Sequence, residues 1–537
     1  MWFKQEVLYP RLTRSLLWMV FLQEVYLVVF LFLVKFSFWN PLSSVLDWVL
    51  HVFHWKIMLY QVFLCLSTVV FGLLNMHFYA VEKFVCSTRF EIICKSLSPH
   101  YLKHILITTI LGGVIAYCCT GLFYNNDEES RTYAEYFLTL EDGSYCFFVV
   151  GYGCYTGIMF SLKYFICNSF LVKFTLEQDV KMNNVRRQIW DVSKDAFTYV
   201  LKGTHWYYIL FLILGFMFNN SASSLTGAFR SNEGWIYGLV SLKLLSVVII
   251  SGAVIFFNFS LYLCIFNTFV SQPYTFPIEV PLKGNKEKVL SKALCSELQL
   301  LKYLAVLDLR TLAQHNLPRR QQIFSISQPG GHPHNWKSIT DICIKSLQAF
   351  IQQLQEYSMM TCNPKAISEK ETLKLKQIPT KFEKKSPDLS EKIFMFIRER
   401  PIISYFFDEF PNAKLMKLFA SSQPSIWMIE ALGFLVSASY NEDKFGVIQS
   451  SLEQIICLLL DIKMAEEKMP VGLVGINTYV KDPQGRYEHI HQRLSLRTST
   501  NTALYRIAAT FKNDINGIYL PQEYRKYFER YLKQSSS

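Results

Sequence analysis

The chain has 537 residues, of which 51% are hydrophobic and 18% charged, and its net charge is +12. The lysines of residues 363–390 are dispersed among glutamates with no interleaved aromatic platform, which argues against binding of nucleic acid. A positive cytosolic face next to an anionic leaflet is the simpler account of the charge. The 13 cysteines are scattered with no CxxC pair, which excludes a disulfide or zinc framework and indicates a reducing compartment.

Six apolar stretches occupy the first 270 residues. A helix needs roughly 20 apolar residues to cross the hydrocarbon core, because backbone groups find no water there. The fifth stretch is the weakest, since its apolar run is short and then turns polar at Asn219. We nevertheless predict six membrane spans and no cleavable signal peptide. The spans are expected at about 16–34, 57–78, 104–124, 145–166, 204–222 and 236–268.

Charge alternates in step with these stretches. Lysine and arginine gather before the first stretch, after the second and after the fourth, whereas the connection 125–143 holds six carboxylates against Arg131 alone. Basic loops resist translocation, so this pattern places both termini in the cytosol. Residues 1–270 are therefore predicted to form a six-span membrane domain.

Three features of this half have two interpretations each. Glu24 and Lys243 lie inside apolar stretches. A charge there either marks an ion or substrate path or belongs to a side chain that faces a neighbouring helix or reaches the interface. The second interpretation is favoured, because two isolated charges on different helices make no relay. Apolar residues at helical spacing in 185–200 predict an amphipathic helix. It is expected either to lie on the cytosolic face of the bilayer or to pack against the C-terminal domain.

Residues 271–537 have a different composition, with 35 Lys+Arg against 26 Asp+Glu. Apolar residues recur at helical spacing, as at Leu452, Ile455, Ile456 and Leu459, and Trp427 marks a further buried helix. We predict an all-helical cytosolic domain in two parts, 271–362 and 391–537. A lysine-rich flexible linker, 363–390, is expected between them. The fold class is thus all-α, a six-helix polytopic membrane domain followed by this helical domain.

Catalytic motifs such as GxSxG, GxxxxGK[ST] and HExxH are missing, so we expect neither an enzyme nor a bound cofactor. The run RRQQIFSISQPGGHPHNW (319–336) is the most distinctive candidate site. His-x-His could supply two metal ligands, but further ligands at suitable spacing are lacking. A structured loop, turned by Pro-Gly-Gly and anchored by Trp336, is the favoured interpretation. Its residues are Arg319, Arg320, Phe324, Ser327, Gln328, Pro329, Gly330, Gly331, His332, Pro333, His334, Asn335 and Trp336.

This run closely resembles the signature of the transmembrane nucleoporins of the nuclear-division-cycle (Ndc-one) type. Residues 426–456 and 498–516 resemble the same family, and the layout of six spans and a helical C-terminal domain agrees with it. The chain departs from the vertebrate members in its linker, which is short and lysine-rich here. That departure puts any linker-borne binding or phosphorylation in doubt.

The resemblance implies a membrane-anchoring scaffold that tethers the nuclear pore complex to the pore membrane of the nuclear envelope and supports pore assembly. It implies docking of soluble scaffold nucleoporins, namely the WD-repeat nucleoporin ALADIN and the RRM-bearing linker nucleoporin, beside other pore-membrane proteins and the lipid bilayer. Neither a nucleic acid nor a small-molecule substrate is expected as a partner. The competing class is a polytopic transporter or a membrane-bound enzyme of the endoplasmic reticulum, although spans one to three do not superpose on four to six.

Overall fold

The structure is a computed structural model of the whole chain, and the description covers the residues whose placement it defines. These are residues 2–35, 41–122, 143–174, 181–217, 242–279, 286–326, 331–362, 405–410, 413–469, 488–512, 514 and 519–536. The predicted linker, 363–390, lies outside this set, as do residues 327–330 of the candidate site and the acidic connection 125–142.

Within the described ranges the secondary structure is helical and no strand longer than an isolated bridge occurs, so the predicted all-α class is confirmed there. The helices of the first part are α1 (Tyr9–Lys35), α2 (Pro41–Val52), α3 (Trp55–Phe78), α4 (Arg89–Ser96), α5 (Pro99–Leu122), α7 (Gly143–Ile166), α8 (Lys181–Met217) and α11 (Leu242–Val270). Those of the second part are α12 (Leu290–Leu294), α13 (Gln299–His315), α14 (Leu317–Phe324), α15 (His334–Cys362), α19 (Ala413–Ala420), α20 (Gln423–Glu442), α21 (Gln449–Glu467), α22 (Glu488–Thr510) and α23 (Gln522–Ser536).

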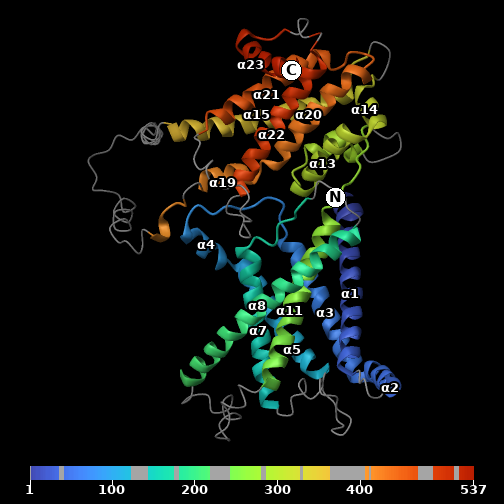
Figure 1. The fold of residues 1–537 in the computed structure, drawn as a ribbon, viewed down its shortest axis with the longest axis vertical. Coiled ribbons are helices and arrows are strands. Elements are labelled where there is room, and N and C mark those ends of the chain that lie inside the picture. Colours follow the sequence, from blue (N-terminus) through green and yellow to red (C-terminus); the bar gives the residue numbers. More distant parts are fainter. Residues whose placement is uncertain are drawn as a thin grey trace, which may run out of the picture. The chain divides into compact units, whose positions relative to one another are not determined.

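The chain forms two compact units. We call residues Met1–Ala80 and Cys94–Gln272 the membrane unit, and Val81–Ile93 and Pro273–Ser537 the helical unit. The helices of each unit appear in Figure 1. Residues 81–93 follow α3 yet belong to the helical unit, which the sequence did not predict.

Five helices among the described residues are long and apolar enough to cross a membrane. They lie at Lys4–Val34, Trp55–Phe78, Pro99–Leu122, Cys146–Ile166 and Leu244–Val270, and they coincide with the first, second, third, fourth and sixth predicted spans. The predicted fifth span, 204–222, is not among the five. Its described part belongs to α8, which already begins at Lys181, and its remainder lies beyond the described residues.

Helices α5 and α7 make the closest contact in the membrane unit. A Cβ atom added to Gly112 would lie 2.3 Å from the Gly153 carbonyl oxygen, and one added to Gly157 would lie 2.2 Å from the Thr108 carbonyl oxygen. No side chain larger than hydrogen fits at these positions without moving a backbone. The small residues therefore let the two helices approach closely, as is usual between membrane helices.

Two polar side chains of α1 pair with α3 inside the membrane unit. Gln23 accepts a hydrogen bond from Thr68 on α3. Glu24 accepts one from the Cys65 thiol at 2.9 Å, so this carboxylate faces a neighbouring helix, as the favoured interpretation predicts. The side chain of Lys243 lies outside the described set.

Helices α7 and α11 run in the same direction. Tyr152 of α7 lies against Gly252, where an added Cβ would be 2.7 Å from the tyrosine ring, and Phe160 lies 5.3 Å from Phe256 between ring centroids. The contacts proceed in the same order along both helices, so the chain must cross back between them.

Helix α8 runs in the opposite direction to both. The Cys264 thiol donates to Gln188 at 3.0 Å, and Tyr199 stacks on Phe256 with ring centroids 5.4 Å apart, so residue numbers rise along α8 as they fall along α11. The predicted helix at 185–200 therefore exists, but it packs along α11 within the membrane unit. This location differs from both predicted ones, because periodicity reveals a buried face without revealing what covers it.

The helical unit is built around α20. Trp427, Leu432, Leu435 and Val436 are essentially inaccessible, so the buried helix predicted from Trp427 is confirmed, and Pro424 stands in its first turn. Helices α13 and α22 pack on α20, and α15 packs on α21, so helices from before and after residues 363–390 share one core.

Candidate functional site

The segment from Asn316 to Trp336, which we call the signature segment, connects three helices of the helical unit. Its first part is α14, a two-turn helix. The Asn316 side chain accepts a hydrogen bond from the Arg319 amide at 3.2 Å, and Pro318 stands in the first turn, where its missing N–H costs nothing. This cap fixes the start of α14 and hence the position of the two arginines.

Arg319 forms a two-pronged ion pair with Asp308 of α13. Its two terminal nitrogens, Nη1 and Nη2, donate to the two carboxylate oxygens at 2.8 Å each. Nη2 also donates to the Phe276 carbonyl at 2.6 Å, and the Phe276 amide donates to Asp308 at 3.0 Å. The Asp308 side chain is only 4% exposed. A parallel pair of charged hydrogen bonds is among the strongest in proteins, so the residues just after α11 are tied to α13 here.

Arg320 makes a second two-pronged pair, with Glu442 at the end of α20. Its nitrogens donate to the carboxylate at 2.9 and 2.7 Å, and a third donation reaches the Ala313 carbonyl at 3.2 Å. The hydrogen bonding to Glu442 raises the pKa of the guanidinium further above its usual range. The adjacent arginines therefore fasten α14 to two different helices.

Two aromatic side chains fasten the far end of the segment. Phe324 and Trp336 are each 2% exposed, with ring centroids 6.2 Å apart. The Trp336 indole N–H donates to the Ser451 hydroxyl of α21 at 2.9 Å. A buried tryptophan usually finds such a partner for its one polar group. Both aromatics thus hold the start of α15 against the core.

The described residues just before α15 are partly exposed. Residues 327–330, which include Ser327, Gln328, Pro329 and Gly330, lie outside the described set. His332 and His334 are both exposed, and the Asn335 amide donates to the Gln322 carbonyl at 3.1 Å. Among the described residues no three histidine, cysteine or carboxylate side chains gather as a metal site would require. The two ends of the segment are therefore fixed to the helical unit, while His332 and His334 stay accessible between them.

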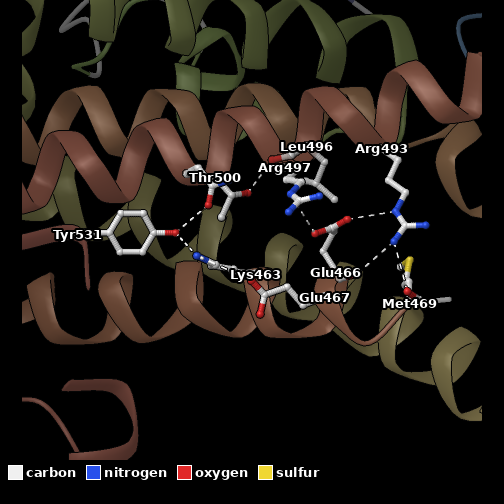
Figure 2. A network of polar contacts seen from close by, with 10 residues as sticks. Lys463, Glu466, Glu467, Met469, Arg493, Leu496, Arg497, Thr500 and Tyr531 are labelled. Carbon is white, nitrogen blue, oxygen red and sulfur yellow. Dashed lines mark hydrogen bonds and ion pairs between the residues drawn. The ribbon is translucent and has the colours of Figure 1, made fainter. Parts of the chain in front are cut away.

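A second polar cluster, which the sequence analysis missed, joins α21, α22 and α23. Glu466 is 5% exposed and lies 3.1 Å from Arg493 and 4.0 Å from Arg497 (Figure 2). Arg493 also donates to the carbonyls of Glu466 and Met469 at 3.4 Å, which caps the end of α21. The spacing of Arg493, Arg497 and Thr500 on one helical face was the signal available in the sequence.

Tyr531 of α23 completes this cluster. Its hydroxyl donates to Asn501 of α22 at 2.7 Å. The hydroxyl also lies within hydrogen-bonding distance of Lys463, as Figure 2 shows. A cavity of about 40 Å³ between α21 and α22, lined by Lys463, Glu466 and Asn501 among others, has room for water. The cluster therefore fixes the last helix to α21 and α22.

Residues 81–93 form a third contact region within the helical unit. Arg89 stacks over the Tyr405 ring at 4.0 Å and donates to the Tyr405 carbonyl at 2.9 Å, while Phe90 stacks on Phe407 with centroids 4.5 Å apart. Gln299 of α13 donates to Glu82 at 3.0 Å. Burial raises the pKa of the Glu82 carboxyl against the lowering effect of Lys302 and of a hydrogen bond from Tyr303. The segment after α3 is thus fastened to α13 and to residues 405–410.

The chain matches the protein family described as nucleoporin protein Ndc1-Nup over residues 6–396 and 381–527. It is 24% identical to nucleoporin NDC1 of Homo sapiens, with 97% of this chain and 96% of the human protein covered. It is 23% identical to nucleoporin NDC1 of Danio rerio, over 99% and 98%, and 22% identical to nucleoporin Ndc1 of Drosophila melanogaster, over 96% of each. The similarity extends over both units and includes the signature segment.

Proposed function

Because the chain belongs to the Ndc1-Nup family of nucleoporins, structural proteins of the nuclear pore membrane and not enzymes, we propose that it tethers the nuclear pore complex to that membrane. In this role it also supports the assembly of pore complexes and their insertion into the nuclear envelope. The observation that carries the proposal is the joining of a bundle of membrane-length helices to a sizeable helical unit in one chain of this family.

The proposed topology has six crossings, with α8 as the fifth. Parallel α7 and α11 require the chain to return between them, and α8 runs antiparallel along both. Thr204 of α8 shares a 2.8 Å hydrogen bond with Tyr152, close to the middle of α7. These contacts support a crossing by α8, for which the composition of the helix alone is weak evidence.

Both termini are proposed to face the cytosol. Arg11, near the start of α1, donates to the carbonyls of Val270 and Gln272 at 3.0 and 2.7 Å, so the first helix begins where the last one ends. Lys95 and Lys103 flank the start of α5, which is the end expected to stay in the cytosol. A glycosylation acceptor inserted near Glu135 should be modified in microsomes, and its remaining unmodified would contradict this topology.

The helical unit is the proposed docking platform for soluble scaffold nucleoporins. By the family resemblance these are ALADIN and the RRM-bearing linker nucleoporin. The signature segment supports this assignment through its build: paired arginines and buried aromatics fix its ends, while Gly331–His334 stays accessible. Such a loop suits a partner contact, since rigid scaffolds commonly present binding residues on loops.

Affinity purification tests the docking proposal. The tagged full chain, solubilised from membranes, should enrich scaffold nucleoporins, and a chain ended after Gln272 should reach the membrane but not enrich them. A third version, His332→Ala with His334→Ala, changes only exposed side chains and should weaken capture without unfolding the unit. Equal capture by the full and shortened chains would exclude the helical unit as the platform.

A further inference from the structure

The first half of α8 lies beside the membrane helices although its sequence is strongly polar. Gln188 is level with Cys264, Tyr199 with Phe256, and Thr204 with Tyr152. Tyr152 lies near the middle of α7, which runs over Gly143–Ile166. Since α8 is antiparallel to α7, its polar half occupies the same levels as the second half of α7.

One side of this half is packed and the other is not. Val185, Ala196 and Val200 are buried, whereas the opposite side is exposed. Trp190 is 75% exposed and Phe197 is 53% exposed. We call the exposed charged and hydroxyl residues of this side the α8 polar face, which consists of Arg186, Arg187, Asp191, Lys194, Asp195, Thr198 and Lys202.

The depth of this face follows from helix geometry. Lys202 is 14 residues beyond Gln188, about 21 Å along the helix at 1.5 Å per residue. It precedes Thr204, the partner of Tyr152, by half a turn. In a flat bilayer with a hydrocarbon core of roughly 30 Å, Lys194 would lie below the headgroups and Lys202 near the midplane. Charges at such depths are strongly disfavoured unless water or headgroups reach them.

We propose that the α8 polar face draws the phospholipid headgroups and water of the cytosolic leaflet down along α8, thinning that leaflet on one side of the protein. This proposal deepens the proposed function and rests on it for one point, the assignment of the N-terminal end of α8 to the cytosolic side. Four basic residues against two carboxylates suit an anionic cytosolic leaflet. The exposed Trp190 and Phe197 suit the boundary between headgroups and acyl chains, where aromatic rings collect.

The direction of the lysines agrees with this arrangement. Side chains on a helix lean toward its N-terminus, which for α8 is the end near Gln188. Lys194 and Lys202 therefore extend toward the headgroups and shorten the depth to be bridged, as snorkelling lysines do. A leaflet thinned on one side only is asymmetric, and this asymmetry suits a protein placed in the sharply curved pore membrane.

Cysteine labelling of the purified full chain tests the proposal in liposomes of phosphatidylcholine with some phosphatidylserine. The probe is a membrane-impermeant maleimide, and mass spectrometry measures each site separately. Thr198→Cys reports on the α8 polar face. Met159→Cys on α7 is the matched control, since it adjoins Phe160, lies at the level of Tyr199 and is itself 37% exposed. The extent of labelling of exposed Cys295 in the helical unit gives the fraction of molecules whose cytosolic side faces outward.

Thr198→Cys is expected to react at least about tenfold faster than Met159→Cys, because thiolates form only where water reaches. Adding Lys194→Leu and Lys202→Leu should slow the Thr198→Cys reaction toward the control rate. Buried Cys264 should stay unlabelled throughout, which shows that α8 remains packed on α11.

Equal slow labelling at both positions, with Cys264 protected, would overturn the proposal, because the face would then lie in hydrocarbon or under a second copy of the chain. The liposomes contain no other protein, so this result is independent of pore tethering. A chain that labels as expected but fails to capture scaffold nucleoporins would refute the proposed function and leave the thinning of the leaflet standing.

Discussion

Replacing Arg319 with methionine should strongly destabilise the helical unit. The substitution leaves Asp308 as a buried carboxylate, since its side chain is only 4% exposed. Of its polar partners, the Phe276 amide still donates a hydrogen bond to it. Breaking a buried ion pair from one side costs about 3–5 kcal/mol. For a unit of this size, each kcal/mol lowers the melting temperature by about 2–4 °C, so a fall of about 6–20 °C is expected.

Labelling of Cys343 measures this effect in the full chain in micelles. Cys343 is 0% exposed in α15, and burial raises the pKa of its thiol to about 12, so the folded unit hardly reacts at pH 8. Labelling against temperature therefore reports the opening of this unit and not of the membrane helices. The double variant Arg319→Met, Asp308→Asn should regain part of the loss, because no unpaired charge remains and the substituted side chain keeps an oxygen that accepts the Phe276 amide.

Arg497→Met is the matched control. Its side chain is 60% exposed and lies 4.0 Å from Glu466, which keeps Arg493 as a partner at 3.1 Å. The loss of such an exposed arginine should cost about 0–1 kcal/mol. If Arg319→Met lowered the Cys343 labelling temperature no more than Arg497→Met does, the tie between α13 and the residues after α11 would not stabilise the unit as described.

Three further changes follow from individual contacts. Gly157→Val should broaden the size-exclusion profile of the chain in detergent, because an added Cβ atom would lie 2.2 Å from the Thr108 carbonyl oxygen. Gly203→Ala should elute normally, because the nearest atom to its added Cβ is 3.7 Å away. A normal profile for Gly157→Val would contradict the close packing of α5 and α7. Trp336→Phe should lose the hydrogen bond to Ser451 and about 1 kcal/mol, and Trp336→Ala about 3–5 kcal/mol, in the same labelling assay; equal effects would show that ring burial contributes nothing. Arg89→Ala should speed amide exchange at residues 405–410 while Arg89→Lys changes it less, and unchanged exchange in both would argue against the stacking contact.

Sequence patterns predicted where the helices of this fold lie better than they predicted which helices pack against one another. Span length and loop charge located five of the membrane helices, because each span must satisfy its backbone by itself. Helix α8 joins the predicted helix at 185–200 to the start of the predicted span at 204–222, since the chain passes from an amphipathic to an apolar pattern with nothing to break the helix between them. Periodicity indicated its buried residues, such as Val200, but could not show that α11 covers them.

In the signature segment, too, an anchoring residue could be predicted but the long-range partners could not. Trp336 could be predicted as an anchor from its type and its place after a turn. The partners of Arg319 and Arg320 could not, because Glu442 is 122 residues away in sequence and Asp308 lies in a helix with no distinguishing pattern around it. The participation of residues 81–93 in the helical unit likewise depends on long-range contacts that leave no local signal.

The position of the protein in the cell tests the central claim most directly. A fluorescent fusion expressed at its native level and imaged by super-resolution microscopy together with a scaffold nucleoporin should give discrete spots around the nuclear rim that coincide with pore complexes. An even distribution through the endoplasmic reticulum, with no enrichment at pores, would contradict tethering of the nuclear pore complex by this chain.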